Sequence, residues 1–296
     1  VAGDYSIKVR YNTTATGVCV KSFLPITITV PTPLVTTATV LPLATCSRGA
    51  TITANSNGGT PFYQYELWDE LNTTKIRLAQ NSGVLEDVPV VTYTVRGLDA
   101  NGCGNTTPVS ITVVPPPIPI PSLDSTLDLC YDAVNQAKIK INVSSGTAPF
   151  SYSLDGGALQ NSNTFLNVGP GIHTVEVTDA NNCKANTQDI KIGDELKVAA
   201  VLTKGLDCTA SPDAIIKVTI SGGARAIRYR IFKNGIKITP NDIAVLDTVT
   251  SFIYVVNEAQ HGDYAFEIID ANGCLKTTDP ITINPKMVPV INSISQ

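Results

Sequence analysis

Three near-identical pentapeptides hold the residues of this chain best suited to chemistry. They read D-A-N-G-C at 99–103, D-A-N-N-C at 179–183 and D-A-N-G-C at 270–274, and we call them the DANxC pentapeptides. The first half of a calcium-binding loop has a carboxylate followed two residues later by an amide oxygen. The same letters also suit a turn between antiparallel strands, because Asp and Asn bond to nearby backbone and Asn and Gly tolerate positive φ.

We favour the turn and keep calcium as the competing hypothesis. No acidic residue follows at the position of a bidentate calcium ligand, and Asn182 replaces the glycine in the second copy. The residues assigned to hairpin turns, and to a weak calcium site in the alternative, are Asp99, Asn101, Asp179, Asn181, Asp270 and Asn272.

Other reactive residues give little support for catalysis. The chain has 2 histidines. His173 stands where the other copies have Tyr5, Tyr93 and Tyr264, which favours a structural role, and His261 lies in an expected loop without a counterpart. The cysteines lack the close spacing of zinc ligands. We therefore expect no enzyme activity, no cofactor and no metal.

The strands that must position the DANxC pentapeptides are short and alternate between apolar and polar residues. One strand precedes each pentapeptide and another follows it, so each pentapeptide joins two strands. Glycine-rich turns at 58–61, 146–149 and 222–224 lead into strands with a large apolar residue at every second position, as in the core of a sandwich. The inward residues are Tyr63, Tyr65, Leu67, Phe150, Tyr152, Leu154, Ile227, Tyr229 and Ile231.

Each copy therefore reads as cysteine, strand, glycine-rich turn, aromatic strand, variable segment, strand, pentapeptide and strand. This pattern predicts an all-β chain of tandem immunoglobulin-like or fibronectin-like β-sandwich modules, arranged as a rod. The expected boundaries are 1–31 for the end of a truncated module, 32–115, 116–193 and 194–285 for complete modules, and 286–296 for the start of another.

Cysteines recur at two places in each module, before the first alternating strand and at the end of the pentapeptide. We predict three disulfides within modules, each stabilising by about 4 kcal/mol in the chain-entropy model. They join Cys46 with Cys103, Cys130 with Cys183, and Cys208 with Cys274. Cys19 is left over as part of the truncated module. Disulfides indicate an oxidising, extracytoplasmic environment.

Composition limits the partners. The net charge is −4 and the charged residues make up 16%, so no general basic field exists to bind nucleic acid. No stretch reaches the roughly 18 consecutive apolar residues of a membrane helix, and no signal peptide begins at Val1. We expect a soluble piece of a longer protein.

These motifs together resemble a known family. G-G-T-P-F-Y-Q-Y from Gly58, followed by a strand that ends in D-A-N-G-C and then by a short Thr-rich strand, is similar to the SprB repeat of Bacteroidetes surface adhesins. The resemblance spans three full copies and two fragments. It departs from the family at three places: the glycine before Tyr93 is missing, Arg225 replaces a proline, and His173 replaces a tyrosine.

The resemblance implies a place at the outer surface, associated with the outer membrane, and attachment to surfaces or polysaccharides during gliding motility. We expect a stalk that also binds weakly at many sites, with neighbouring modules of the chain as further partners. Accessory modules of a secreted polysaccharide-degrading enzyme are the alternative. A receptor ectodomain is a third hypothesis, suggested by N-x-S/T sites at Asn12, Asn72, Asn105 and Asn142.

A ligand surface is expected where the modules differ most, between the aromatic strand and the strand before the pentapeptide. Trp68 is the single tryptophan, and it suits either the core or an exposed platform. Arg228 and Arg230 have outward parity and predict a basic stripe. This stripe is either a solvated face or a contact for an acidic polysaccharide or a neighbouring module.

Overall fold

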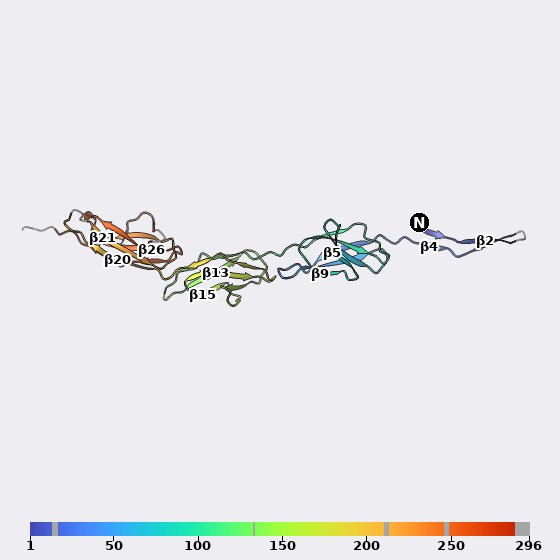
Figure 1. Cartoon of the computed structure of the whole chain (residues 1–296), viewed down its shortest axis with the longest axis horizontal. Helices are drawn as coiled ribbons and strands as arrows, with labels where there is room; N and C mark the ends of the chain where they lie inside the picture. The colour runs from blue at the N-terminus through green and yellow to red at the C-terminus, as the bar shows by residue number, and fades with distance from the viewer. Residues whose placement is uncertain (14–16, 133, 210–212, 246–248, 288–296) are drawn as a thin grey trace, which may run out of the picture. The chain divides into compact units, whose positions relative to one another are not determined.

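A computed structural model describes the chain except residues 14–16, 133, 210–212, 246–248 and 288–296, and the side chains of 12–19 are likewise not described. The described part contains 28 strands and one 3-10 helix, Glu258–Gln260, with no α-helix. This confirms the all-β prediction. No helix in that part is long and apolar enough to cross a membrane. The chain divides into two compact units, Val1–Pro116 and Pro117–Gln296, and Figure 1 labels some of their strands.

The first unit begins with a ribbon of four strands. β1 (Gly3–Tyr5) pairs antiparallel with β4 (Ile26–Ile28), and β2 (Lys8–Thr13) pairs with β3 (Gly17–Ser22). All its described side chains are exposed. The side chain of Cys19 lies outside the described residues, and so does most of the segment 286–296.

The first sandwich completes this unit with two sheets. One sheet has the order β5-β6-β9, and the other β11-β10-β7-β8. Their core is centred on Ile52, Leu67, Leu85 and Val95. The strands are β5 (Val35–Val40), β6 (Ala50–Asn57), β7 (Gln64–Asp69), β8 (Lys75–Gln80), β9 (Val84–Val88), β10 (Thr92–Leu98) and β11 (Val109–Thr112).

The second sandwich opens the second unit. Its sheets have the orders β12-β13-β15, β14-β17-β18 and β16-β19, and its core includes Ile139, Ile141, Val175 and Val177. The strands are β12 (Pro121–Leu123), β13 (Ala137–Val143), β14 (Ser151–Leu154), β15 (Thr164–Val168), β16 (Gly171–His173), β17 (Val175–Thr178), β18 (Lys184–Asn186) and β19 (Ile190–Ile192).

The third sandwich pairs a sheet of order β20-β21-β25 with one of order β23-β22-β26-β27, in which β24 also pairs with β22 and β28 with β26. Its core is more aromatic, since Phe252 stacks on Tyr229 and meets Phe266 edge to face. The strands are β20 (Lys197–Lys204), β21 (Ala214–Ser221), β22 (Arg228–Lys233), β23 (Ile236–Lys237), β24 (Ile243–Ala244), β25 (Ser251–Val256), β26 (Gly262–Ile269), β27 (Leu275–Thr277) and β28 (Ile281–Ile283).

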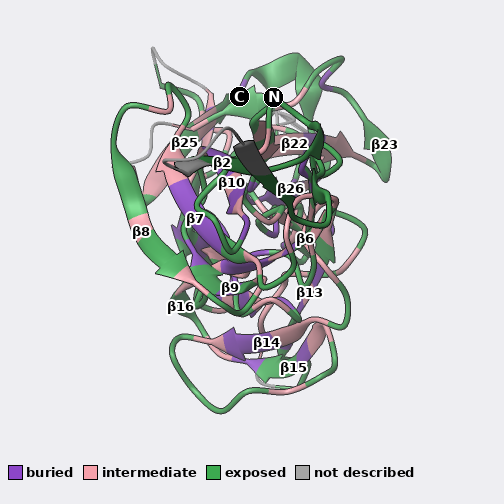
Figure 2. Cartoon of the chain, turned by 90° about the vertical axis from the view of Figure 1, so that its right-hand side faces the viewer, coloured by how far each residue is buried: buried purple, intermediate pink, exposed green. Residues whose placement is uncertain are grey.

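The alternation of apolar and polar residues along each strand explains which face of each sheet is buried. In β21, Ile216, Val218 and Ile220 are buried while Lys217 and Thr219 between them are exposed. A fully buried side chain of this size contributes about 1.5–3 kcal/mol. Figure 2 shows the same contrast, with buried residues along β7 and β14 and exposed residues along β8.

One aromatic position anchors a corner in every copy. The hydroxyls of Tyr5, Tyr93 and Tyr264 each donate to the carbonyl four residues earlier, at 2.6, 3.1 and 2.6 Å. In the second sandwich, His173 Nε2 lies 3.0 Å from the Gly169 carbonyl, which is the same offset. Its Nδ1 lies 2.7 Å from Asp155 Oδ2. The histidine therefore makes the contact of the tyrosine it replaces.

Candidate functional site

The Asp of the first DANxC pentapeptide ties two turns together at one end of the first sandwich. Asp99 Oδ1 accepts the N–H groups of Asn101 (2.9 Å) and Cys103 (2.8 Å), which closes its own turn. Asp99 Oδ2 accepts the N–H of Thr60 (3.0 Å) in the glycine-rich turn. The N–H of Ala100 donates to the Thr60 carbonyl (3.1 Å). One buried carboxylate thus joins the pentapeptide to the glycine-rich turn.

The same hydrogen bonds between the pentapeptide and the glycine-rich turn recur in the other two sandwiches. Asp179 Oδ2 accepts the N–H of Thr147 (2.9 Å), and Asp270 Oδ2 accepts the N–H of Ala224 (2.8 Å). In both cases Oδ1 accepts the two N–H groups of its own turn, at 2.8 and 2.9 Å and at 2.9 and 2.9 Å. We call this arrangement of carboxylate, pentapeptide and glycine-rich turn the Asp lock. It gives a structural reason for the repeated Asp.

Backbone donors stabilise the charged form of the lock carboxylate. The N–H groups of Thr60 and then Cys103 hold the pKa of Asp99 below its ordinary value. The oxygens that a calcium ion would use are therefore already hydrogen-bonded. In the part of the chain that the structure describes, no group of three or more His, Cys, Asp or Glu side chains is arranged to hold a metal ion.

Glycine is needed where the glycine-rich turn approaches the lock. Gly59 has φ +58°, and a Cβ there would lie 3.0 Å from Asp99 Oδ2. Gly223 has φ +71°, and its Cβ would lie 2.9 Å from Leu196 Cδ1 and 3.3 Å from Asp270 Cβ. The positive φ strains any larger residue at these two positions, and the short distances require the neighbouring atoms to move. The glycine motif and the DANxC motif are therefore two halves of one structure.

The disulfides differ from the prediction. Cys130 is bonded to Cys274, with Cα atoms 5.4 Å apart and a sequence separation of 144. Cys103 and Cys208 are exposed free thiols. The predicted pairs of Cys46 with Cys103, Cys130 with Cys183, and Cys208 with Cys274 are therefore wrong. Neither Cys46 nor Cys183 is a free thiol.

The length of one strand explains why cysteines of the same module do not meet. Cys130 precedes β13, whereas the pentapeptide 179–183 is locked to Thr147 beyond the other end of β13. Seven residues of strand separate these ends by about 20 Å, whereas disulfide-bonded Cα atoms lie within about 7 Å. The same geometry applies to β6 in the first sandwich and β21 in the third.

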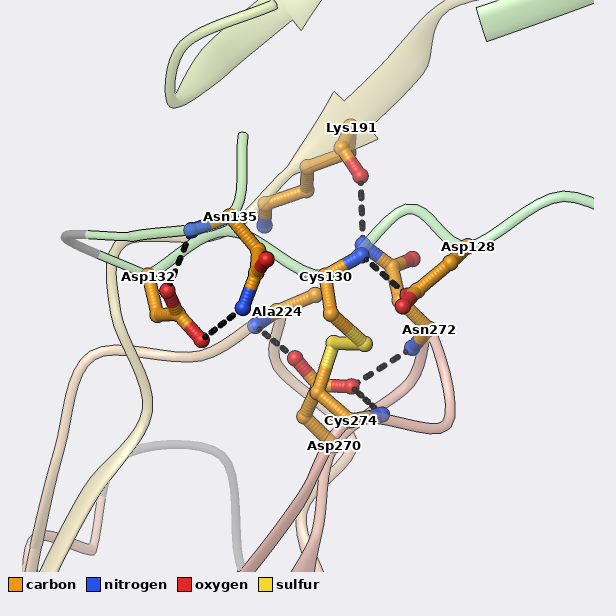
Figure 3. The surroundings of a disulfide bond; sticks show 9 residues. All are labelled: Asp128, Cys130, Asp132, Asn135, Lys191, Ala224, Asp270, Asn272 and Cys274. Carbon is orange, nitrogen blue, oxygen red and sulfur yellow. Dashed lines mark hydrogen bonds between the residues drawn. A yellow bond between two sulfur atoms is a disulfide. The ribbon is translucent and has the colours of Figure 1, made fainter. Parts of the chain in front are cut away.

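The Cys130–Cys274 disulfide joins the second and third sandwiches, and Figure 3 shows its surroundings. Asn272 Nδ2 donates to the Lys191 carbonyl (2.9 Å) beside it. A Cβ on Gly193 would lie 2.2 Å from Ala224 N, so the two sandwiches are in close contact there. We call this region the joint.

The asparagine of the pentapeptide contacts different partners in different sandwiches. Asn101 Nδ2 donates to Thr60 Oγ1 and Asn181 Nδ2 to Thr147 Oγ1, both at 2.9 Å and within one sandwich. In the third sandwich Ala224 stands at the position of these threonines and has no hydroxyl. The asparagine of the third pentapeptide, Asn272, donates instead to the Lys191 carbonyl of the second sandwich.

Aspartates hold the loop that carries Cys130. Asp128 Oδ1 accepts the N–H of Cys130 (2.8 Å), and Asp132 Oδ1 accepts the N–H of Asn135 (2.6 Å). The N–H groups of Asn135 and Val134 lower the pKa of Asp132. The sequence reasoning did not identify this loop, although the signal was present as aspartates on both sides of the cysteine.

Trp68 is half-buried on the outer face of the first sandwich. Its ring lies between Arg96 (4.4 Å from the guanidinium carbon to the ring centre) and Lys75 (5.1 Å from Nζ). Its Nε1 donates to Glu66 Oε2 (2.9 Å). Trp68 is therefore part of a polar cluster on the sheet and is neither a core residue nor a bare platform.

The arginines of the third sandwich form ion pairs within it. Arg230 contacts Asp242 (2.6 Å) and Glu267 (2.8 Å), and Arg228 lies 3.9 Å from Asp242. The hydrogen bond from Arg230 lowers the pKa of Asp242. Intramolecular carboxylates neutralise much of the charge of the expected basic stripe, and its role as a contact for a ligand stays a prediction.

A hollow beside the first glycine-rich turn was missed. It has a volume of about 350 Å³ and is lined by Phe62, Tyr63, Tyr65 and Asn81. Phe62 is 89% exposed and has φ +79°. An exposed aromatic ring beside an amide is a surface suited to sugars. Its signal in the sequence was an aromatic residue out of phase with the alternation of β7.

A family comparison agrees with the resemblance found in the sequence. Residues 128–159 match the family model described as the SprB repeat. The match begins in the loop of Cys130 and runs through β13, the second glycine-rich turn and β14. A search of curated proteins finds no match.

Several solved structures are similar to this chain at low TM-scores. Extracellular domains 3–5 of Drosophila OTK are 13% identical, with 80% of this chain and 91% of that chain covered and a TM-score of 0.36. A tetra-tandem repeat in the extending region of a large adhesion protein is 12% identical, covering 96% and 82% with a TM-score of 0.32. A structure from a 1.5-MDa bacterial ice-binding adhesin is 14% identical, covering 86% and 98% with a TM-score of 0.28.

Proposed function

We propose that this chain is a stalk segment of a cell-surface adhesin of the gliding-motility type, exported and held at the outer membrane. It is a non-enzymatic structural module in which a disulfide joins the second and third sandwiches. The stalk carries weak binding sites for surfaces or polysaccharides, repeated so that many act together.

One observation carries the stalk role: the joint between the second and third sandwiches. A disulfide, the Asn272 hydrogen bond and the close approach at Gly193 hold it. The disulfide and the hydrogen bond from Asn272 together restrict bending and twisting at the joint. The SprB-repeat match of residues 128–159 supports the place of such a stalk at a cell surface.

The stalk role is tested by measuring how mobile the joint is. Fluorophores on unnatural amino acids at the exposed positions Leu159 and Ile236 report the distance between the second and third sandwiches. We expect a narrow distance distribution in the oxidised chain and a broad one in a Cys130→Ser/Cys274→Ser variant. The matched control, Cys103→Ser/Cys208→Ser, removes two cysteines without touching the joint. An equally broad distribution in the oxidised chain contradicts the stalk role.

The binding role is tested with the oxidised chain on a panel of neutral and acidic polysaccharides. The hollow beside Phe62 presents an exposed aromatic ring and an amide, which suit a sugar. We expect weak binding that Phe62→Ala lowers by roughly tenfold, which corresponds to about 1.4 kcal/mol. Leu78→Ala is the control, since Leu78 is an exposed apolar residue on β8 away from this hollow. If neither form binds, the segment acts as a spacer alone.

A further inference from the structure

The third sandwich has, at the end away from the joint, the same elements that the second sandwich contributes to the joint. In the second sandwich, the joint uses Cys130, in the loop before β13, and Lys191, in the last strand β19. In the third sandwich, Cys208 lies in the loop before β21, and Thr282 lies in the last strand β28. The two faces therefore correspond element by element.

The face at Cys208 is open in the described structure. Cys208 is an exposed free thiol, and it lines a cavity of about 590 Å³ together with Leu202, Leu206, Thr282 and Asn284. An aspartate also supports this loop, one residue further along than in the Cys130 loop: Asp207 Oδ1 accepts the N–H of Thr209 (3.1 Å), whereas Asp128 Oδ1 accepts the N–H of Cys130 itself. The cavity beside Cys208 lies at the place that corresponds to the part of the second sandwich where hairpin 270–274 is bound.

We propose that this face is a docking surface for the DANxC hairpin of a further repeat, sealed by a disulfide from Cys208. The occupant is identified by the joint, where the corresponding face holds hairpin 270–274 through Cys274 and Asn272. By correspondence with Lys191, the carbonyl of Thr282 accepts the amide of the incoming asparagine. The proposal rests on the stalk function and extends it to the next module.

One position limits how the incoming repeat approaches. Asn284 stands where the second sandwich has Gly193, whose Cβ would lie 2.2 Å from Ala224 N. The glycine-rich turn of the incoming repeat therefore lies further from this strand than Gly223 does from Gly193.

A second copy of this chain supplies a hairpin of the required chemistry. Residues 99–103 have the same sequence as 270–274, and Cys103 is an exposed free thiol. Bond formation requires an oxidant: the two thiols lose two protons and two electrons to oxidised glutathione, which leaves as two glutathione molecules. Cys103 of one copy and Cys208 of another then form one disulfide.

The experiment uses two variants of the full chain, both with Cys19→Ser so that no further thiol takes part. One also carries Cys103→Ser and the other Cys208→Ser. They are mixed at equal, high concentration in a glutathione redox buffer, and the disulfide-linked dimers are identified by peptide mapping. We expect the heterodisulfide of Cys208 with Cys103 to exceed the two homodisulfides together at least fivefold, whereas random pairing at equal concentrations gives a ratio of one. Dimers in random proportions would overturn the proposal.

A second variant separates docking from simple thiol reactivity. Leu206→Asp places a charge in the cavity without changing either cysteine, so it should return the dimers to random proportions. A heterodisulfide share that Leu206→Asp leaves unchanged would show that the cavity takes no part. Since the joint is intact in every variant, the fluorophore distances from Leu159 to Ile236 report the stalk function independently of this outcome.

Discussion

The pentapeptides at 99–103 and 270–274 have the same five letters but different contacts. Asp99 and Asp270 make the same three hydrogen bonds. Their asparagines and cysteines differ: in the first sandwich the amide stays within the sandwich and the thiol is free, whereas in the third both reach the second sandwich.

The difference lies in what surrounds each pentapeptide. Thr60 offers a hydroxyl to Asn101, whereas Ala224 offers none to Asn272. The second sandwich presents Cys130 and the Lys191 carbonyl beside the third. A repeated motif therefore fixes the shape of one turn, and the neighbouring residues decide whether its remaining groups act within a module or between modules.

The largest effect is expected from removing the disulfide of the joint. Cys130→Ser/Cys274→Ser opens a loop of 144 residues, for which the chain-entropy model gives a loss of about 5 kcal/mol. Urea unfolding followed by hydrogen exchange in β21 measures it. Cys103→Ser, at the matched cysteine of the first sandwich, should leave the unfolding midpoint unchanged. A similar loss in both variants would remove the distinction between the two pentapeptides.

The next effect concerns the lock that the two pentapeptides share. Asp270 is 1% exposed, and Asp270→Ala leaves three backbone N–H groups without their acceptor. We expect a loss of about 3 kcal/mol, measured by urea unfolding of the third sandwich. Asp99→Ala should destabilise the first sandwich in the same direction, reported by the fluorescence of Trp68. If only one of the two variants is destabilised, the lock is not a common element.

Removing the amides gives a smaller effect that separates the two pentapeptides. Asn272→Ala removes the bond to the Lys191 carbonyl and should lower the stability of the joint by about 1 kcal/mol. Hydrogen exchange in β19 and β28 measures the effect. Asn101→Ala removes only the bond to Thr60, so its effect should be confined to the first sandwich. An effect of Asn272→Ala that spares β19 would contradict its role between sandwiches.

The smallest effect is a pH dependence of the first sandwich. Because hydrogen bonds lower the folded pKa of Asp99, its contribution to stability is complete above the unfolded value near 4 and is lost as the pH falls through the folded value. The urea midpoint, read from Trp68 fluorescence, should therefore fall below about pH 4. Asp99→Asn cannot titrate at this position and should flatten that part of the profile. An unchanged profile in this variant would assign the acid effect to other carboxylates.

Local patterns in the sequence were sufficient to predict the strands. Alternation identified the buried faces, as at Ile216 and Val218, and Asp with Asn and Gly identified the turns. These features depend on residues near one another in the chain. The resemblance to the SprB repeat, drawn from the same motifs, is confirmed by the family match at 128–159.

The contacts between distant residues could not be read in the same way. The cysteine pairs were assigned by counting positions within a module, but a strand of seven or eight residues keeps those positions about 20 Å apart. The parity of Arg228 and Arg230 predicts an outward position, whereas their ion-pair partner Asp242 lies in a variable segment whose path the sequence does not indicate. In both cases the sequence does not show which distant residues meet.

The Cys130–Cys274 disulfide also determines how the second unit carries a mechanical load. A pull along the chain reaches Cys130 and crosses directly to Cys274, so residues 131–273 carry no tension while the bond is intact. The strands from β13 to β26 lie within this segment between the two cysteines. Most of two sandwiches is therefore protected from unravelling, and the bond limits how far this part of the chain can lengthen when its ends are pulled apart.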